Sequence, residues 1–314
     1  NSVFWGSPKA VFISSGNLTV TNSVMEASGP GGRIYDFASG ASATAFRGDY
    51  NAYSLNNGAL ICEQQRPAIG SEFYGDLPAW TALTGADRHS MSQDPLFADA
   101  VRGDFHPRST QGRFVSGIWT NDAVLSPLVD AGAPGWPADR EPAPNGGIIN
   151  IGAYGNTPES SMTQTNPPWL RVVSYNSGGT MAGTVLLYWL HGGMSSNAHV
   201  QLEYSTDYEI SWNPIASNLP AGSREYAWDV SGLPLSIGLN WKVVLQSDTN
   251  VFDISDTPAS LKTKNYDYYV NDGSTAGDVW CSSPGMPWDP WTTIGTNPAM
   301  PIDSLNSLLE HYPV

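Results

Sequence analysis

A short repeat near the start of the chain constrains the fold more than any other sequence feature. The tripeptide Asn1-Ser2-Val3 recurs as Asn22-Ser23-Val24, a spacing of about 21 residues, and residues 49–53 form a weaker third copy. Around the second copy, apolar and polar side chains alternate, which is the period of a strand with one buried face. A repeat of this length with short strands is typical of a β-solenoid. We therefore predict stacked parallel strands, with Asn1 above Asn22 in an amide ladder.

The composition favours an all-β chain and excludes several classes of protein. The 314 residues include 32 Gly, 24 Pro and 12 Trp, and almost no stretch has the period of a long helix, which excludes a helical bundle. The net charge of −15 excludes a nucleic-acid partner, because phosphate binding needs a basic surface. The longest apolar run, residues 185–190, is far too short for a transmembrane segment.

Charge and cysteine content bear on localisation and cofactors. An acidic, lysine-poor surface is common in secreted proteins, so we expect an extracellular or cell-surface location. Such a surface can attract Ca²⁺, which leaves a Ca²⁺ site open, while no other cofactor is expected. The candidate carboxylates for a Ca²⁺ or catalytic cluster are Asp94, Asp104, Asp130 and Asp139. The competing interpretation is that these residues make turns.

Cys62 and Cys281 are expected to be buried free thiols, without zinc spacing.

Five motifs in the first half of the chain carry a resemblance to a known family. They are NSVFWG from residue 1, DPLF from 94, GDFH from 103, SPLVDAGAP from 126 and INIGAYGN from 149. Their order resembles the last coils and the C-terminal cap of bacterial right-handed parallel β-helix proteins, the pectin-lyase-like superfamily. The resemblance implies β-helix coils and a cap over residues 1–158, with an irregular region at 60–150. Ile149, Ile151 and Tyr154 would cover the open end.

A second pattern begins after a polar segment. Residues 159–168 end in two prolines and are interpreted as a linker. Over residues 169–264, alternating segments separated by turns give about seven strands in about ninety residues, which predicts an antiparallel β-sandwich. The segment LEYSTDYEISWNPI resembles immunoglobulin-like or fibronectin type III-like modules of bacterial surface and carbohydrate-active proteins. The predicted core residues are Val200, Leu202, Trp228, Trp241 and Val243.

The last region, residues 265–314, is predicted to be a strand plus a capping helix. Tyr268 to Val270 is the strand, and Asp303 to Tyr312 is the helix, with Pro301 and Asp303 in its opening turn. This region resembles the opening of another parallel β-helix. The Trp-rich loop between strand and helix offers candidate carbohydrate-binding residues, which are Trp280, Trp288 and Trp291.

These observations favour a non-enzymatic function. No nucleophile elbow, zinc-protease motif or phosphate loop occurs, so no catalytic residue is predicted. The first hypothesis is an extracellular structural or adhesive protein of a cell surface, sheath or filament. The alternatives are a fragment of a secreted polysaccharide lyase or glycosidase with an accessory module, and a carbohydrate-binding protein with a polysaccharide partner.

The unpaired start of the first coil suggests how copies could assemble. An uncapped β-helix presents a row of unpaired backbone groups, which is a template for another strand. If the C-terminal region of one copy closes the Asn1 end of the next, the head-to-tail contact builds a filament. The competing interpretation is a longer parent chain whose other coils cover both ends. The predicted assembly residues are Asn1, Val3, Trp5, Tyr268, Tyr269, Val270, Leu305, Leu308, Leu309 and Tyr312.

Overall fold

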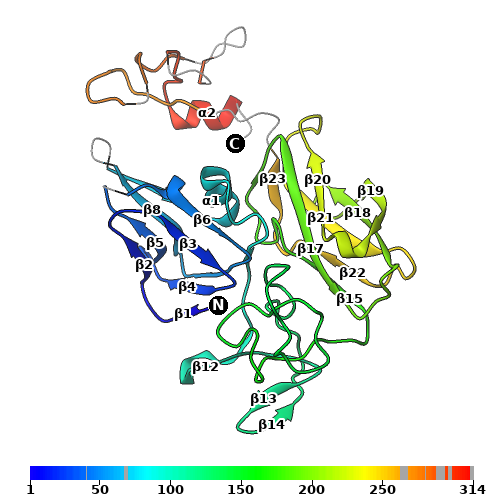
Figure 1. Ribbon diagram of the computed structural model, residues 1–314. Helices are drawn as coiled ribbons and strands as arrows, with labels where there is room; N and C mark the ends of the chain where they lie inside the picture. The colour runs from blue at the N-terminus through cyan, green and yellow to red at the C-terminus, as the bar shows by residue number, and fades with distance from the viewer. Residues whose placement is uncertain are drawn as a thin grey trace.

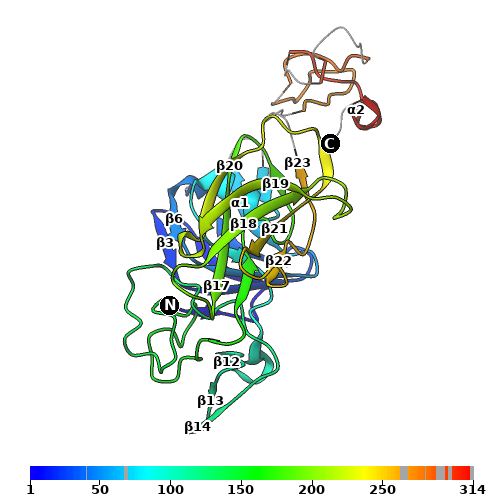
Figure 2. The same cartoon turned by 90° about the vertical axis from the view of Figure 1, so that its right-hand side faces the viewer.

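The computed structural model describes residues 1–39, 41–66, 70–261, 268–279, 281–287, 294–295 and 299–311. Strands predominate over helices in these residues, as expected for the all-β class (Figure 1). We refer to residues 1–92 as the N-terminal part, 93–168 as the loop-rich part, 169–261 as the two-sheet part and 268–311 as the C-terminal segment. Figure 1 shows the N-terminal and two-sheet parts side by side, and Figure 2 views the molecule from the side of the two-sheet part.

The N-terminal part passes repeatedly through three sheets. Its strands are β1 (Val3–Phe4), β2 (Lys9–Ile13), β3 (Leu18–Thr21), β4 (Val24–Ser28), β5 (Arg33–Phe37), β6 (Phe46–Asp49), β7 (Ala52–Asn56), β8 (Leu60–Arg66), β9 (Gly70–Tyr74) and β10 (Met91–Ser92). The sheet orders are β1-β4-β7-β10, β2-β5-β8-β9 and β3-β6. Among these strands the pairs are parallel except for the hairpin of β8 and β9. The chain therefore returns to each sheet one layer further on.

The repeat that opened the sequence analysis sets the register of the first sheet. Val3 pairs with Val24, and Val24 pairs with Ala52 of the third copy, which confirms the parallel stacking. The predicted amide ladder is wrong. Asn1 donates through Nδ2 to the carbonyl of Gly155 (3.2 Å), and Asn22 accepts at Oδ1 from the amide of Ala133 (2.7 Å). The loop-rich part supplies both partners because it lies beside these turns.

Helix α1 (Leu77–Thr84) packs against the interior that the three sheets enclose and inserts Trp80 into it. It begins after Asp76, whose carboxylate accepts from the amide of Ala79, and it ends at Gly85 in a left-handed conformation. Trp80 is fully buried and stacks on Tyr35 with ring centroids 5.2 Å apart. The other large inward-facing residues are Met25, Phe37, Phe46 and Tyr53. The short 3-10 helix Ala43–Ala45 lies against this core.

The predicted irregular region, residues 60–150, contains more regular structure than expected. Besides β8, β9, α1 and β10, it holds β11 (Phe97–Asp99), the 3-10 helix Ala100–Arg102, β12 (Asp104–Pro107), β13 (Arg113–Val115) and β14 (Ile118–Thr120). The prediction is wrong at these residues. The elements are too short to produce a visible period, and β11–β12 and β13–β14 are local antiparallel hairpins.

The predicted cap lies along a sheet rather than over the end of the coil. Ile149 and Ile151 are buried, and Ile151 packs in one cluster with Val24, Ala52 and Met91. These three residues occupy equivalent positions of the first sheet, on the face opposite to Met25 and Tyr53. The placement of the cap is therefore corrected: residues 149–152 cover the outer face of the first sheet, because that face is apolar.

The two-sheet part consists of two sheets on either side of one core. Its strands are β15 (Trp169–Val172), β16 (Thr180–Met181), β17 (Thr184–Gly192), β18 (His199–Ser205), β19 (Asn213–Pro220), β20 (Glu225–Asp229), β21 (Ser236–Leu245), β22 (Phe252–Ile254) and β23 (Ala259–Leu261), with a 3-10 helix at Ala221–Ser223. One sheet is β15-β17-β20, and the other is β16-β23-β21-β18-β19 with β22 beside β21. The predicted core is confirmed, since Val200, Leu202, Trp228, Trp241 and Val243 are all buried.

The two-sheet part packs directly against the N-terminal part. Val173, Tyr188 and Leu190 belong to the same apolar cluster as Val24 and Leu128. Residues 159–168 connect the parts as expected, but they are not a free linker. Ser160, Ser161 and Thr163 are buried, and Thr163 donates to Asp130 (2.9 Å). The parts therefore share a core.

The C-terminal segment has a small apolar core of its own. Val270 and Met286 each form a parallel bridge with Ile302, and helix α2 spans Leu305–His311. Ile302 and Leu308 are buried, with Tyr268, Met286 and Met300 packed against them. A helix is present where one was predicted, but it begins at Leu305, so Pro301 and Asp303 precede it and do not form its opening turn. The predicted strand Tyr268–Val270 is wrong, because only Val270 forms a bridge. Tyr312, the side chain of Leu309, Trp280, Trp288 and Trp291 lie outside the described residues.

Candidate functional site

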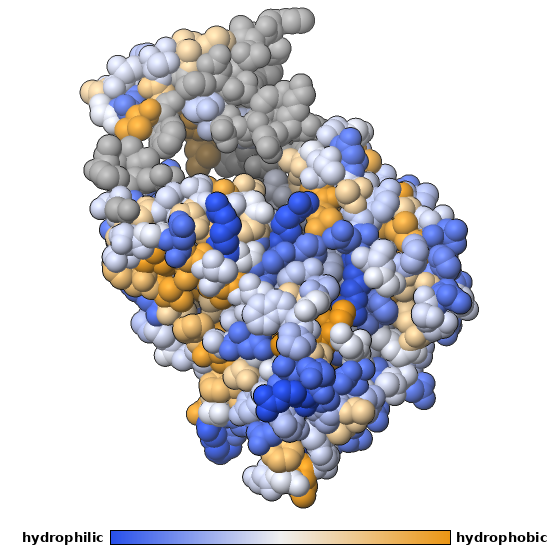
Figure 3. Space-filling view, viewed as in Figure 1, coloured by the Kyte–Doolittle hydropathy of each residue, from blue (hydrophilic) through white to orange (hydrophobic). Residues whose placement is uncertain are grey.

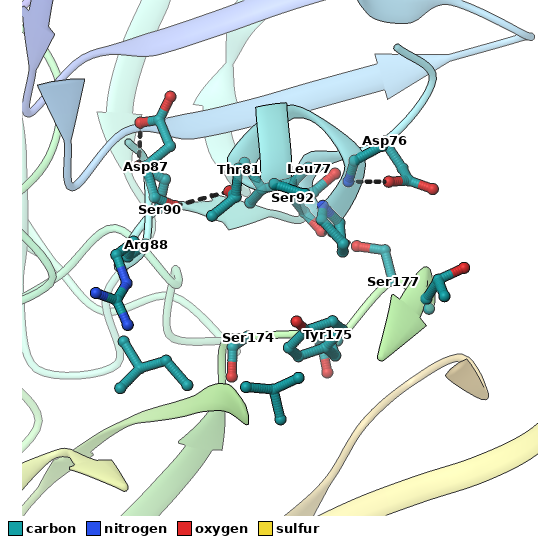
Figure 4. Close-up of a pocket in the computed structure, with 18 of the residues that line it drawn as sticks. Asp76, Leu77, Thr81, Asp87, Arg88, Ser90, Ser92, Ser174, Tyr175 and Ser177 are labelled. Carbon is teal, nitrogen blue, oxygen red and sulfur yellow. Dashed lines mark hydrogen bonds between the residues drawn. The ribbon is translucent and has the colours of Figure 1, made fainter. Parts of the chain in front are cut away.

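A cleft of about 680 Å³ opens between the N-terminal and two-sheet parts (Figure 4). One wall is α1 together with residues 87–92, and the other is residues 173–186, which follow β15 and reach into β17. Junctions between two folded parts are frequent places for ligand binding. We take this cleft as the candidate site.

The floor of the cleft is organised by the carboxylate of Asp87, which is buried. It accepts four hydrogen bonds, from Tyr53 Oη (2.6 Å), Trp80 Nε1 (2.8 Å), Ser90 Oγ (2.5 Å) and Asn51 Nδ2 (3.0 Å). Burial raises the pKa of Asp87, and the four donors oppose that rise. The carboxylate therefore fixes the loop that carries Arg88 and Ser90 and is not available as a catalytic base.

Arg88 is the positive charge of the cleft. Its side chain is exposed and makes no hydrogen bond or ion pair with the described residues. Figure 4 shows it on one side of the opening, with Tyr175 on the opposite wall. The cleft therefore offers a guanidinium group that an anion could bind in a bidentate way.

Tyr175 is held in place by the loop that follows β15. The next residue, Asn176, is buried and exchanges two hydrogen bonds with Asp256, one from its Nδ2 (2.6 Å) and one from the Asp256 amide (3.1 Å). Gly179 lets this loop approach α1, since a Cβ there would lie 2.5 Å from Pro78, and its φ of 104° also favours glycine. Burial and the charge of Asp76 raise the pKa of Tyr175 to about 12, so its hydroxyl is neutral at pH 7.

The cleft does not have the acid–base pair of a glycosidase. Such enzymes need two accessible carboxyl groups that flank the scissile bond. The carboxylates lining the described cleft are Asp76 and Asp87, and Asp87 is occupied by its four donors. Asp76 accepts from the amide of Ala79 (2.8 Å) as the N-cap of α1. These groups suit binding better than hydrolysis.

His89, the residue after Arg88, links the N-terminal part to β20 of the two-sheet part. Its Nδ1 lies 2.6 Å from Asp49 Oδ2 of the N-terminal part, and its Nε2 lies 2.9 Å from Glu225 Oε2 of β20. The ring stacks on Tyr50 with centroids 4.8 Å apart. Burial lowers the pKa of His89, but the hydrogen bonds and charges of Asp49 and Glu225 outweigh burial and raise it overall.

The predicted metal or catalytic carboxylates do not come together. Asp94 accepts from the amide of Leu96 (2.9 Å), Asp104 bonds to His106 Nδ1 (2.6 Å), and Asp130 accepts from the amide of Gly146 (3.1 Å). No group of three or more His, Cys, Asp or Glu side chains among the described residues could hold a metal ion. The turn interpretation describes Asp94 and Asp104, each of which accepts from the amide two residues later. It is wrong for Asp130, whose buried carboxylate joins Gly146 and Thr163. No contact places Asp139 with these residues. Cys62 is a buried free thiol, and Cys281 is free but half-buried.

The predicted assembly residues fall into two separate places. Asn1, Val3 and Trp5 belong to the first layer of the N-terminal part, where Trp5 packs edge-on against Phe97 with centroids 5.2 Å apart. The others that the structure describes lie in the C-terminal segment, where Leu308 is buried but Leu305 is 59% exposed. Leu305 therefore does not share the buried face predicted for it.

No protein-family model, curated protein or solved structure matches this chain. Neither helix that the structure describes has the length and hydropathy of a membrane span. The cleft residues were not predicted from the sequence. Arg88 and Tyr175 stand far apart in the chain and share no motif, so only the packing of the two parts brings them to one site.

Proposed function

We propose that this protein is an extracellular structural or adhesive protein that assembles head-to-tail. In this proposal the N-terminal part is the end of a right-handed parallel β-helix, the two-sheet part is an immunoglobulin-like or fibronectin type III-like sandwich, and the C-terminal segment starts another β-helix. The pairing of each strand with the strand three places later supports the first assignment, and the shared core of two mainly antiparallel sheets supports the second.

The observation that best supports the proposal concerns the first layer of the N-terminal part, which consists of β1, β2 and β3. Among the residues that the structure describes, β1, β2 and β3 are each the edge strand of their sheet, and their free backbone groups face the same side. Phe12 of β2 is 61% exposed. In the next layer, by contrast, most residues of β4 and β5 are buried. Figure 3 shows apolar side chains over the edge that carries β2. Such an edge is a template for further strands.

The proposed occupant of this edge is the C-terminal segment of a second copy. Its parallel bridges through Ile302 give it the start of the same stacked arrangement. It also exposes apolar side chains that a contact could bury, since Val270 is 38% and Leu305 is 59% exposed. A contact between two different surfaces of identical chains continues from copy to copy, which produces a filament when no ring closes.

A substitution that places a negative charge on the edge strand β2 tests the proposal. We expect the wild-type chain to form filaments with rising concentration, and Phe12→Glu to stay monomeric, by light scattering and electron microscopy. Phe73→Glu is the matched control, because Phe73 is 60% exposed on β9, at the opposite edge of the same sheet. Deletion of residues 268–314 should also abolish assembly. A wild-type chain that is monomeric throughout, or a Phe12→Glu variant that assembles like the wild type, would overturn the proposal.

A further inference from the structure

We propose that the cleft between α1 and the loop after β15 binds a saccharide that carries a carboxylate group. The residues that line this site are not those of the assembly edge. Three features of the cleft support the proposal: a preformed shape, a guanidinium and several hydroxyl groups that have no partner among the described residues, and an aromatic ring beside them.

The shape of the cleft is fixed by contacts between its walls. Ser177 Oγ donates to the carbonyl of Ser92 (2.5 Å), and Gln93 Nε2 donates to the carbonyl of Val172 (3.1 Å). His89 adds a third link to Glu225, and the shared apolar cluster lies behind. A ligand therefore meets an already formed site and does not have to order it, which lowers the free-energy cost of binding.

The charge of the ligand follows from Arg88. The whole chain has a net charge of −15, so most of its surface repels an anion. Two carboxylates also line the cleft, but Asp87 is buried and accepts four hydrogen bonds, and Asp76 accepts from the Ala79 amide as the N-cap of α1. The Arg88 guanidinium, by contrast, has no partner among the described residues. A carboxylate on the ligand would satisfy this guanidinium through a charge-assisted hydrogen bond.

The saccharide class follows from the other lining groups. The hydroxyls of Ser92, Thr180 and Thr184 line the cleft and form no hydrogen bond with described residues. Sugars offer many donors and acceptors in a small volume, which such hydroxyls can match. The Tyr175 ring, fixed by its neighbour Asn176, supplies an apolar surface and a neutral hydroxyl at one end. A volume of about 680 Å³ lies within the range of small-ligand sites.

Binding of matched disaccharides to matched variants tests this inference. The probes are a glucuronate-containing disaccharide and the neutral disaccharide in which glucose replaces glucuronate, with affinities measured by calorimetry. We expect the wild-type chain to bind the acidic disaccharide about tenfold or more tightly than the neutral one. Arg88→Gln should lose this preference. Arg140→Gln, which removes an exposed charge in the loop-rich part, should keep it.

The outcomes separate this site from the assembly edge. Phe12→Glu should bind the acidic disaccharide with wild-type affinity, whether or not the chain assembles. Equal affinities of the wild type and Arg88→Gln would overturn the inference, as would no binding of the acidic disaccharide to the wild type up to about 10 mM. Loss of binding in Arg140→Gln would also overturn it, because the effect would then come from net charge alone.

Discussion

At the scale of single residues, Asp87 stands out near the cleft because its side chain must accept four hydrogen bonds. Two of its four donors, Trp80 Nε1 and Asn51 Nδ2, have no acceptor capacity, and they bond to different carboxylate oxygens. Only a group with an acceptor at both positions satisfies them. This requirement explains why a carboxylate is buried here despite the cost of removing it from water.

The substitution Asp87→Asn tests this environment. An amide has one oxygen and one NH₂ group, so either Trp80 Nε1 or Asn51 Nδ2 would face a donor. We expect the free energy of unfolding in urea to fall by about 1–3 kcal/mol. Asp94→Asn, in an exposed turn, is the control and should lose less than about 1 kcal/mol. An Asp87→Asn chain with the wild-type free energy of unfolding would show that the four hydrogen bonds do not stabilise this part of the chain.

At the scale of elements, α1 contributes to the core of the N-terminal part through the side chains that it buries there. Its amphipathic character is slight, and only Leu77 and Trp80 are buried. Trp80 nevertheless meets three aromatic residues, Tyr35, Phe37 and Phe46, at centroid distances of 5.0 to 6.2 Å. One side chain therefore contributes most of the contact between the helix and the sheets.

We expect Trp80→Ala to lower the free energy of unfolding by about 3–5 kcal/mol, because it leaves a large cavity and removes a donor to Asp87. Urea unfolding followed by circular dichroism measures the change. Trp136→Ala is the matched control, since Trp136 is 47% exposed, and it should cost less than about 1 kcal/mol. Similar losses in the two variants would contradict the role assigned to α1.

The elements also show what could be predicted from the sequence. The register of Val3 with Val24 followed from an identical tripeptide, and the core positions of Leu202 and Trp241 followed from alternation, because both signals are local. Helix α1 was missed because it has only about two turns and its apolar residues are not confined to one face. The cleft was missed because Arg88 and Tyr175 meet only through the packing of two parts, which no local pattern encodes.

At the scale of the whole molecule, the junction between the N-terminal and two-sheet parts combines apolar and ionic contacts. The apolar cluster around Val24, Tyr188 and Leu190 gives the junction its contact area. His89 adds the contact that depends on pH, since both of its ring nitrogens face carboxylates from different parts. Only the protonated ring has two N–H donors, so a neutral His89 can donate to Asp49 or to Glu225 but not to both.

The pKa of His89 is raised in the folded chain, so its contribution to stability is fully present below the unfolded pKa of about 6.5 and is lost as pH rises through the folded value. We therefore expect the free energy of unfolding to fall as pH increases above about 6.5, and His89→Gln to remove most of that fall. Burial raises the pKa of Asp253 to about 6 and lowers the pKa of His191 to about 4. Both groups therefore change the free energy of unfolding mainly at lower pH. Urea unfolding at a series of pH values from 6.5 to 9 measures the slope, with His199→Gln, on β18 away from the junction, as the control. The same slope in the wild type and in His89→Gln would show that the two carboxylates do not hold a charged histidine between the parts.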